Sequence, residues 1–81
     1  MGSDLATQGP RWRREEIALL ELVSVGYGNK EIAYRLGVSV SAVKKRLSRL
    51  MRVLGVRSRA GLVRAALARG VISMTNKHGD M

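Results

Sequence analysis

Apolar residues between Ser39 and Gly55 recur at the spacing of an α-helix. Four of them follow one another at intervals of four, three and four residues: Val43, Leu47, Leu50 and Leu54. This spacing forms one stripe of a helix and does not fit the alternation of a strand. Ser39 is a favourable N-cap and Gly55 a favourable C-terminal stop. The sequence therefore predicts a helix over residues 40–54, whose stripe other elements must bury.

Three further segments show the same period, over residues 11–25, 29–36 and 59–69. Their expected core residues are Trp12, Leu19, Leu20, Val23, Ile32, Ala33, Leu36, Leu62, Val63, Ala66 and Leu67. No segment alternates as a half-buried strand does. The predicted fold class is therefore all-α with four helices.

Both ends of the chain lack this periodicity. Residues 1–10 mix Gly, Ser, Thr and Pro and predict a flexible arm, whereas residues 73–81 predict a disordered tail. The folded domain is expected over residues 11–72. With 81 residues and no cysteine, the chain is close to the lower size limit for independent folding, and its stability must come from packing.

The charge of the chain is strongly positive and unevenly placed. Fifteen Lys and Arg against six Asp and Glu give a net charge of +9, and no acidic residue occurs between Glu31 and Asp80. Such a charge on a small domain predicts a polyanionic partner. No apolar run approaches the roughly 20 residues of a bilayer span, and the N-terminus lacks a signal-peptide pattern. We therefore expect an intracellular protein without membrane contact.

The segment Gly37-Val38-Ser39 joins two of the predicted helices by a short turn containing glycine, as a helix-turn-helix requires. In that motif the second helix enters the major groove of DNA. Its side opposite the apolar stripe carries hydrogen-bond donors and no anion: Ser41, Lys44, Lys45, Ser48, Arg49 and Arg52. Such donors suit guanine edges and phosphate oxygens. A merely solvated helix face usually alternates the sign of its charges, so double-stranded DNA is the predicted partner.

Several blocks of the sequence resemble the LuxR-type helix-turn-helix domain of bacterial transcription regulators. They are Asn29-Lys30-Glu31-Ile32-Ala33, Leu36-Gly37-Val38-Ser39, Val43-Lys44 and Leu54-Gly55-Val56-Arg57-Ser58-Arg59. The resemblance covers about residues 12–72. It implies a four-helix domain that binds DNA as a dimer in the bacterial cytoplasm, at the nucleoid, with the last helix as the dimer contact. No cofactor or metal is expected, because the chain has no cysteine and a single histidine.

The resemblance and the position on the helix together predict the site residues. Base contacts are expected from Lys44, Lys45, Ser48 and Arg49. Phosphate contacts are expected from Lys30, Ser41, Arg46 and Arg52. A weak homodimer is expected through the small-residue side of the last helix, at Gly61, Arg64, Ala65 and Ala68.

The chain departs from the family pattern at a few positions. Arg13 stands where a threonine usually caps the first helix, so that helix end is expected to be looser or capped in another way. Gly28 replaces a serine cap, Ala42 a threonine and Arg46 a frequent histidine. Ile17 replaces a polar residue and is expected to be exposed.

Two alternative functions remain open. The helix around Val43-Lys44 also resembles region four of sigma factors, although such a module does not need the fourth helix. A protein-interaction module that binds RNA polymerase or a regulator would use Ile17 and the small-residue side of the fourth helix. An enzyme is not expected, because the chain has no cysteine, a single histidine (His78) and no phosphate-cradling loop.

Overall fold

The computed structural model describes residues 12–73, and these form four α-helices joined by short turns. The helices are α2 (Arg14–Val25), α3 (Asn29–Leu36), α4 (Val40–Leu54) and α5 (Arg59–Ala68). This part of the chain contains no strand, so the predicted all-α fold with four helices is confirmed. The predicted arm over residues 1–10 and residues 74–81 of the predicted tail lie outside the described residues.

Serine side chains cap the starts of α4 and α5. The Ser39 hydroxyl accepts a hydrogen bond from the Ala42 backbone N–H at 3.0 Å, and α4 begins directly after it. At the start of α5, the Ser58 hydroxyl accepts from the Gly61 N–H, also at 3.0 Å. The bounds of α3 and α4 therefore coincide with the prediction, and α5 ends one residue earlier, at Ala68.

The start of α2 differs from the prediction. The helix begins at Arg14, later than the expected start at Arg11, and Arg13 is its N-cap with an extended backbone. An arginine side chain has no acceptor and cannot cap the helix. Instead Glu16 Oε1 accepts a hydrogen bond from the Arg13 backbone N–H at 3.0 Å, which is the glutamate half of a capping box. The expectation that this end is capped in another way is confirmed.

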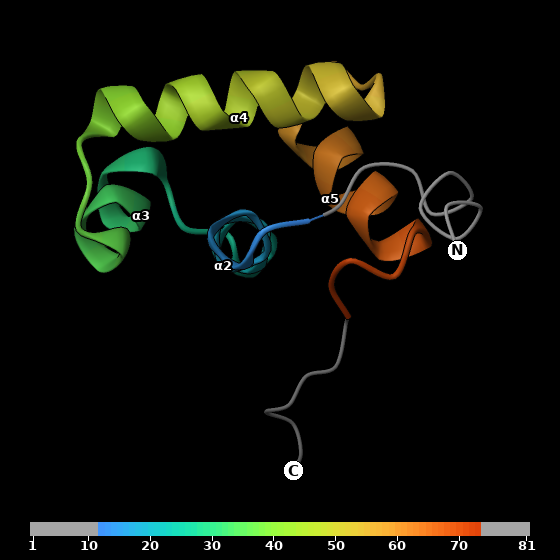
Figure 1. The fold of residues 1–81 in the computed structure, drawn as a ribbon, viewed down its shortest axis with the longest axis horizontal. Helices are drawn as coiled ribbons and strands as arrows, with labels where there is room; N and C mark the ends of the chain where they lie inside the picture. The colour runs from blue at the N-terminus through green and yellow to red at the C-terminus, as the bar shows by residue number, and fades with distance from the viewer. Residues whose placement is uncertain (1–11, 74–81) are drawn as a thin grey trace, which may run out of the picture.

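The helix α4 lies across the other three helices (Figure 1). In this view α2 is seen end-on below α4, with α3 on one side and α5 on the other. Contacts join α3 to α4, α5 to both α2 and α4, and α2 to α3. The core residues lie where these helices meet: Leu19, Leu20, Val23, Ile32, Ala33, Val43, Leu47, Leu50, Leu54, Leu62, Ala66 and Ile72.

This arrangement explains why one expectation about α2 is wrong. Ile17 was expected to be exposed, but it is half-buried and packs against the core. A helix enclosed by several neighbours buries a wide arc of its surface, whereas a helix at the edge of a domain buries one stripe. Ile17 therefore does not offer a free apolar contact to another protein.

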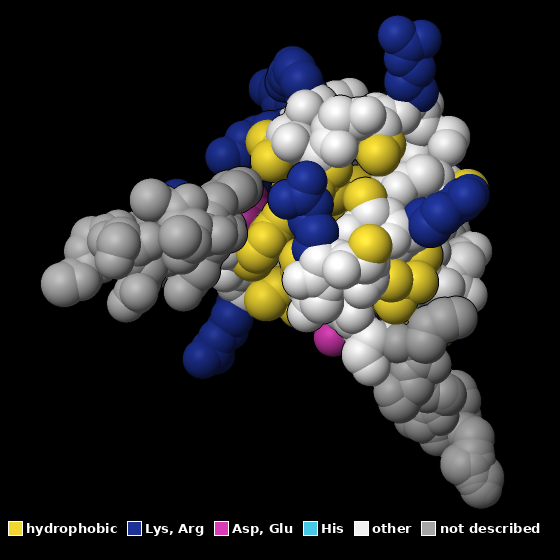
Figure 2. Space-filling view, turned by 90° about the vertical axis from the view of Figure 1, so that its right-hand side faces the viewer, with side chains coloured by type: hydrophobic (Ala, Val, Ile, Leu, Met, Phe, Trp, Pro, Cys, Tyr) yellow, Lys and Arg dark blue, Asp and Glu magenta, His cyan; other side chains and the backbone are white. Residues whose placement is uncertain are grey.

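Among the charged side chains on the visible surface, cations predominate. Figure 2, which looks onto the side of the molecule that carries α5, shows Lys and Arg projecting around hydrophobic patches, with little Asp or Glu. None of the buried residues among 12–73 is polar or charged. Nor does any helix in this range have the length and apolar character needed to cross a membrane.

Candidate nucleic-acid interface

The turn between α3 and α4 fixes these two helices relative to each other. Gly37 ends α3 with a φ of 69° and a ψ of 36°, in the left-handed region that favours glycine. The next residue, Val38, donates its backbone N–H to the Ala33 carbonyl at 3.0 Å and packs its side chain against the core. With Ser39 capping α4, the segment has the short, anchored turn of a helix-turn-helix.

The helix α4 has a buried side and an outward side. Val43, Leu47, Leu50 and Leu54 are buried. The residues on the opposite side, which we name the outer α4 face, are exposed: Ser41, Lys44, Lys45, Ser48 and Arg52. Within residues 12–73 their side chains form no ion pair or hydrogen bond. The outer α4 face therefore presents donors that are free to bind another molecule.

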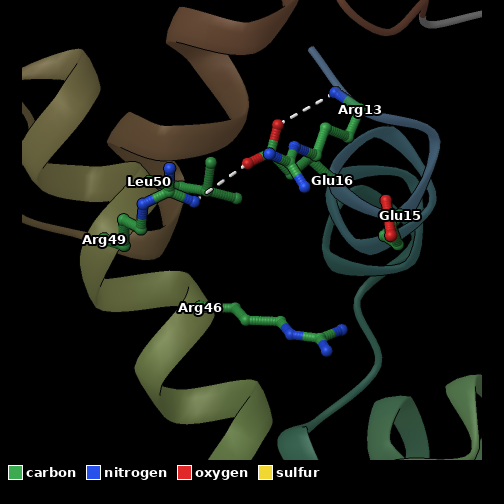
Figure 3. Close-up of a pocket in the computed structure, with 6 residues that line it drawn as sticks. All are labelled: Arg13, Glu15, Glu16, Arg46, Arg49 and Leu50. Carbon is green, nitrogen blue, oxygen red and sulfur yellow. Dashed lines mark hydrogen bonds and ion pairs between the residues drawn. The ribbon is translucent and has the colours of Figure 1, made fainter.

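Two further arginines, Arg46 and Arg49, lie on the flank of α4 beside α2. They line a shallow polar pocket together with Arg13, the N-cap of α2, and with Glu15 and Glu16 of its first turn. Figure 3 shows the Arg46 side chain directed across this pocket and Arg49 joined to Glu16. The Arg49 Nη1 atom lies 3.1 Å from Glu16 Oε2. The structure therefore separates Arg49, expected to contact bases, from the residues of the outer α4 face.

Lys30, an expected phosphate contact, is exposed in the first turn of α3 and forms no ion pair within residues 12–73. The N-cap of α3 is Gly28, which provides no side-chain cap. Free backbone N–H groups and the helix dipole favour anions at such a helix start. A phosphate near Lys30 would therefore meet favourable charges from both the side chain and the helix.

Arg59 is half-buried and has a packing role. It stands at the first position of α5, and its guanidinium reaches the loop between α2 and α3. One terminal nitrogen donates to Asn29 Oδ1 at 2.7 Å, and the other donates to the Tyr27 carbonyl at 2.8 Å. Arg35 stacks over the Tyr27 ring at 4.3 Å from its centre. Arg59 therefore fastens the start of α5 to the start of α3.

We expect Arg59→Ala to lower the free energy of unfolding by about 2 kcal/mol, because hydrogen bonds to charged groups contribute about 1.5–3 kcal/mol. Arg57→Ala is the matched control, since Arg57 is exposed and forms no hydrogen bond or ion pair within residues 12–73. It should change stability by less than about 0.5 kcal/mol. Urea unfolding followed by circular dichroism measures both. Equal effects of the two variants would contradict the role assigned to Arg59.

The residues expected to form the dimer contact on α5 differ in their burial. Arg64 and Ala68 are exposed, whereas Gly61 and Ala65 are half-buried. The Ala65 side chain packs against the core. The outward side of this helix, which we name the outer α5 face, consists of the exposed residues Ala60, Arg64 and Ala68.

A glycine is needed at position 61 because of neighbouring residues in the same chain. A Cβ atom added there would lie 3.2 Å from the Ser58 hydroxyl oxygen and 3.4 Å from Val56 Cβ. The glycine therefore makes room for the cap of α5, and its small size does not by itself indicate contact with another helix.

Residues 13–66 match the model of the family described as bacterial regulatory proteins, luxR family. The chain belongs to this family. The resemblance inferred from the sequence blocks is thereby confirmed, and the outer α4 face belongs to a DNA-binding helix-turn-helix domain.

Curated relatives place this domain within longer proteins. Over 59 residues the chain is 41% identical to the oxygen regulatory protein NreC of Staphylococcus aureus strain JH9, and equally similar to NreC of strains JH1 and USA300. The match covers 73% of this chain but 27% of each relative. The chain thus corresponds to about a quarter of the length of these relatives. No solved structure gives a significant match.

Proposed function

We propose that this LuxR-family domain binds double-stranded DNA in a sequence-specific manner and thereby regulates transcription. The observation that carries the proposal is the outer α4 face, a row of exposed Ser, Lys and Arg donors without partners in the described residues. The anchored turn from Gly37 to Ser39 presents this helix at the surface. Both NreC and the family are named as regulatory proteins, which supports a role in regulation.

The width of α4 suggests how the contacts are divided. A helix with its side chains is about 10–12 Å across, close to the roughly 12 Å width of the major groove. Side chains that point straight outward then reach base edges, and we assign this role to Lys44, Lys45 and Ser48. Side chains toward the walls and the ends of the helix meet phosphates, and this role falls to Ser41, Arg46, Arg52 and, from α3, Lys30.

We also propose that the domain acts as a weak homodimer through the outer α5 face. One reading helix contacts only a few base pairs, which is too little information to select a site in a genome. Pairing on inverted half-sites about one helical turn apart doubles the contacted sequence. Because each protomer carries a net charge of +9, like charges oppose association in free solution. The protein is therefore largely monomeric at micromolar concentration and low salt, and pairs on DNA.

Alanine substitutions on the outer α4 face test whether it reads bases. Lys44→Ala and Lys45→Ala should each weaken binding to a preferred site by about 1–3 kcal/mol, because each removes a donor to a base edge. On random-sequence DNA each loss should be smaller, which reduces the preference. The preferred site is first selected from a random DNA pool, and affinities are measured by fluorescence anisotropy at one salt concentration.

Arg52→Ala provides the matched comparison on the same helix. A phosphate contact carries no base information, so this variant should weaken binding to preferred and random DNA by the same factor. Val53→Ala removes an exposed uncharged side chain of α4 and should leave binding unchanged. If both lysine variants also lose affinity by the same factor for preferred and random DNA, α4 does not read bases.

A further inference from the structure

The carboxylate of Glu16 holds two groups at once (Figure 3). Its Oε1 atom accepts the Arg13 backbone N–H at 3.0 Å, and its Oε2 atom lies 3.1 Å from Arg49 Nη1. Both carboxylate oxygens are therefore engaged, one in capping the start of α2 and the other in binding a cation of α4.

The two partners of this ion pair differ in their freedom to move. The Glu16 side chain is 16% exposed and is tied to the start of α2 by its capping bond. The Arg49 side chain is 62% exposed, and within residues 12–73 its guanidinium forms no ion pair or hydrogen bond other than that with Glu16. Glu16 thus forms a fixed anchor, and Arg49 is the partner that can leave.

The position of the anchor determines where the Arg49 charge lies. Glu16 belongs to α2, so the pair holds the guanidinium on the flank of α4 and away from the outer α4 face. Arg46 lines the same pocket but forms no ion pair within residues 12–73. Arg49 is thus the one cation of α4 neutralised by a described acidic residue.

We infer that Glu16 is a positioning residue that withholds Arg49 from the DNA backbone and so limits the affinity of the domain for DNA of any sequence. The inference rests on the proposed DNA-binding function. A phosphate must compete with the Glu16 carboxylate for the Arg49 guanidinium, and this competition is the same at every site because phosphates do not vary with sequence. Glu16 therefore lowers affinity for preferred and random DNA alike and leaves the base preference unchanged.

Glu16→Gln removes the anchor while keeping the cap. The single amide oxygen of glutamine can still accept the Arg13 N–H, as in the glutamine form of the capping box, but its NH₂ group offers Arg49 no acceptor. We expect binding to a random-sequence duplex to tighten by about three- to fivefold, an effect limited by the weakness of exposed ion pairs. The slope of log K against log salt should steepen by about 0.9, the contribution of one more phosphate.

The control is Glu15→Gln, which makes the same change of charge on the same turn. Glu15 is exposed, lines the same pocket and forms no ion pair within residues 12–73, so its substitution reports the effect of net charge alone. In an Arg49→Gln background, Glu16→Gln should have no more effect than Glu15→Gln. Glu16→Asp, which keeps the charge but is too short to span both partners, should also tighten binding. It provides a second test if Glu16→Gln does not fold by circular dichroism.

The outcomes separate this inference from the proposed function. If the unsubstituted protein binds neither duplex, the proposed function is wrong. If it binds DNA but Glu16→Gln matches Glu15→Gln, Glu16 acts only through net charge and the inference is wrong. Weaker binding by Glu16→Gln would also overturn it, because the pair would then be orienting Arg49 toward DNA.

Discussion

Raising the salt concentration from about 50 to about 200 mM will weaken binding to random-sequence DNA by about 250- to 1,000-fold per protomer. Binding of each phosphate by a cation releases condensed counterions, which gives a slope of about −0.9 in log K against log salt. The cations proposed to approach DNA are Lys30, Lys44, Lys45, Arg46 and Arg52. On random-sequence DNA, which offers no preferred base edges, Lys44 and Lys45 neutralise phosphates as well. About five neutralised phosphates give a slope of about −4 to −5.

Fluorescence anisotropy with a labelled duplex measures this slope over several salt concentrations. Arg69→Ala is a useful control, since Arg69 is exposed at the C-cap of α5 and is not among the residues proposed to contact DNA. It removes one positive charge and should leave the slope unchanged. A slope near zero for the unsubstituted protein would exclude DNA as the partner.

The parts of the fold that the sequence predicts are those set by nearby residues. Gly37 and Gly55 take left-handed conformations at the ends of α3 and α4, and Ser39 caps the start of α4. Each of these signals acts within one turn of the residue that carries it, so the sequence alone locates both helices. The apolar periodicity placed the start of α2 too early, because the cap comes from Glu16 inside the helix and the Arg13 side chain is not a capping group. The family resemblance, in contrast, placed the capping position at Arg13.

The sequence predicted the site residues whose exposure depends only on their position along one helix. It did not predict those whose side chains bind residues distant in the sequence. The exposed donors of the outer α4 face follow from helical spacing. The contact of Arg49 with Glu16 joins residues 33 apart, and that of Arg59 with Asn29 joins residues 30 apart, so neither follows from local spacing. One signal for Arg59 was present: a cation in the first turn of a helix opposes the helix dipole, which points to a compensating contact elsewhere.

The structure also bears on the competing functions. A protein-interaction module was supported by Ile17 and by the small residues of the fourth helix. Ile17 packs against the core, and Gly61 leaves room for the Ser58 side chain that caps α5. The family match over residues 13–66 includes most of α5, and buried Leu62 and Ala66 make that helix part of the core. These observations favour the LuxR-type interpretation over a sigma-like module.

Ala68→Glu will weaken binding to a palindromic site by about 100- to 1,000-fold and leave the affinity for a single half-site nearly unchanged. When one protomer of a pair is bound to DNA, it holds the second protomer close to the other half-site, so the second binding step is effectively intramolecular. Such linkage can raise affinity by about 10²–10⁴-fold without any new DNA contact. Ala68 is exposed on the outer α5 face. A glutamate there places a charge in the proposed dimer contact without disturbing the core, whereas Ala65 already packs against the core.

Val25→Glu is the matched control for this substitution. Val25 is the last residue of α2, as Ala68 is of α5, and it is 65% exposed. Both variants therefore add one negative charge at a helix C-terminus, with the same small cost from the helix dipole. Gel-shift titrations on the palindrome and on a half-site, with circular dichroism as a check on folding, measure the cooperativity. If Ala68→Glu binds the palindrome as cooperatively as Val25→Glu, the outer α5 face is not the dimer contact, because a charge placed there does not disturb the pairing of the two protomers.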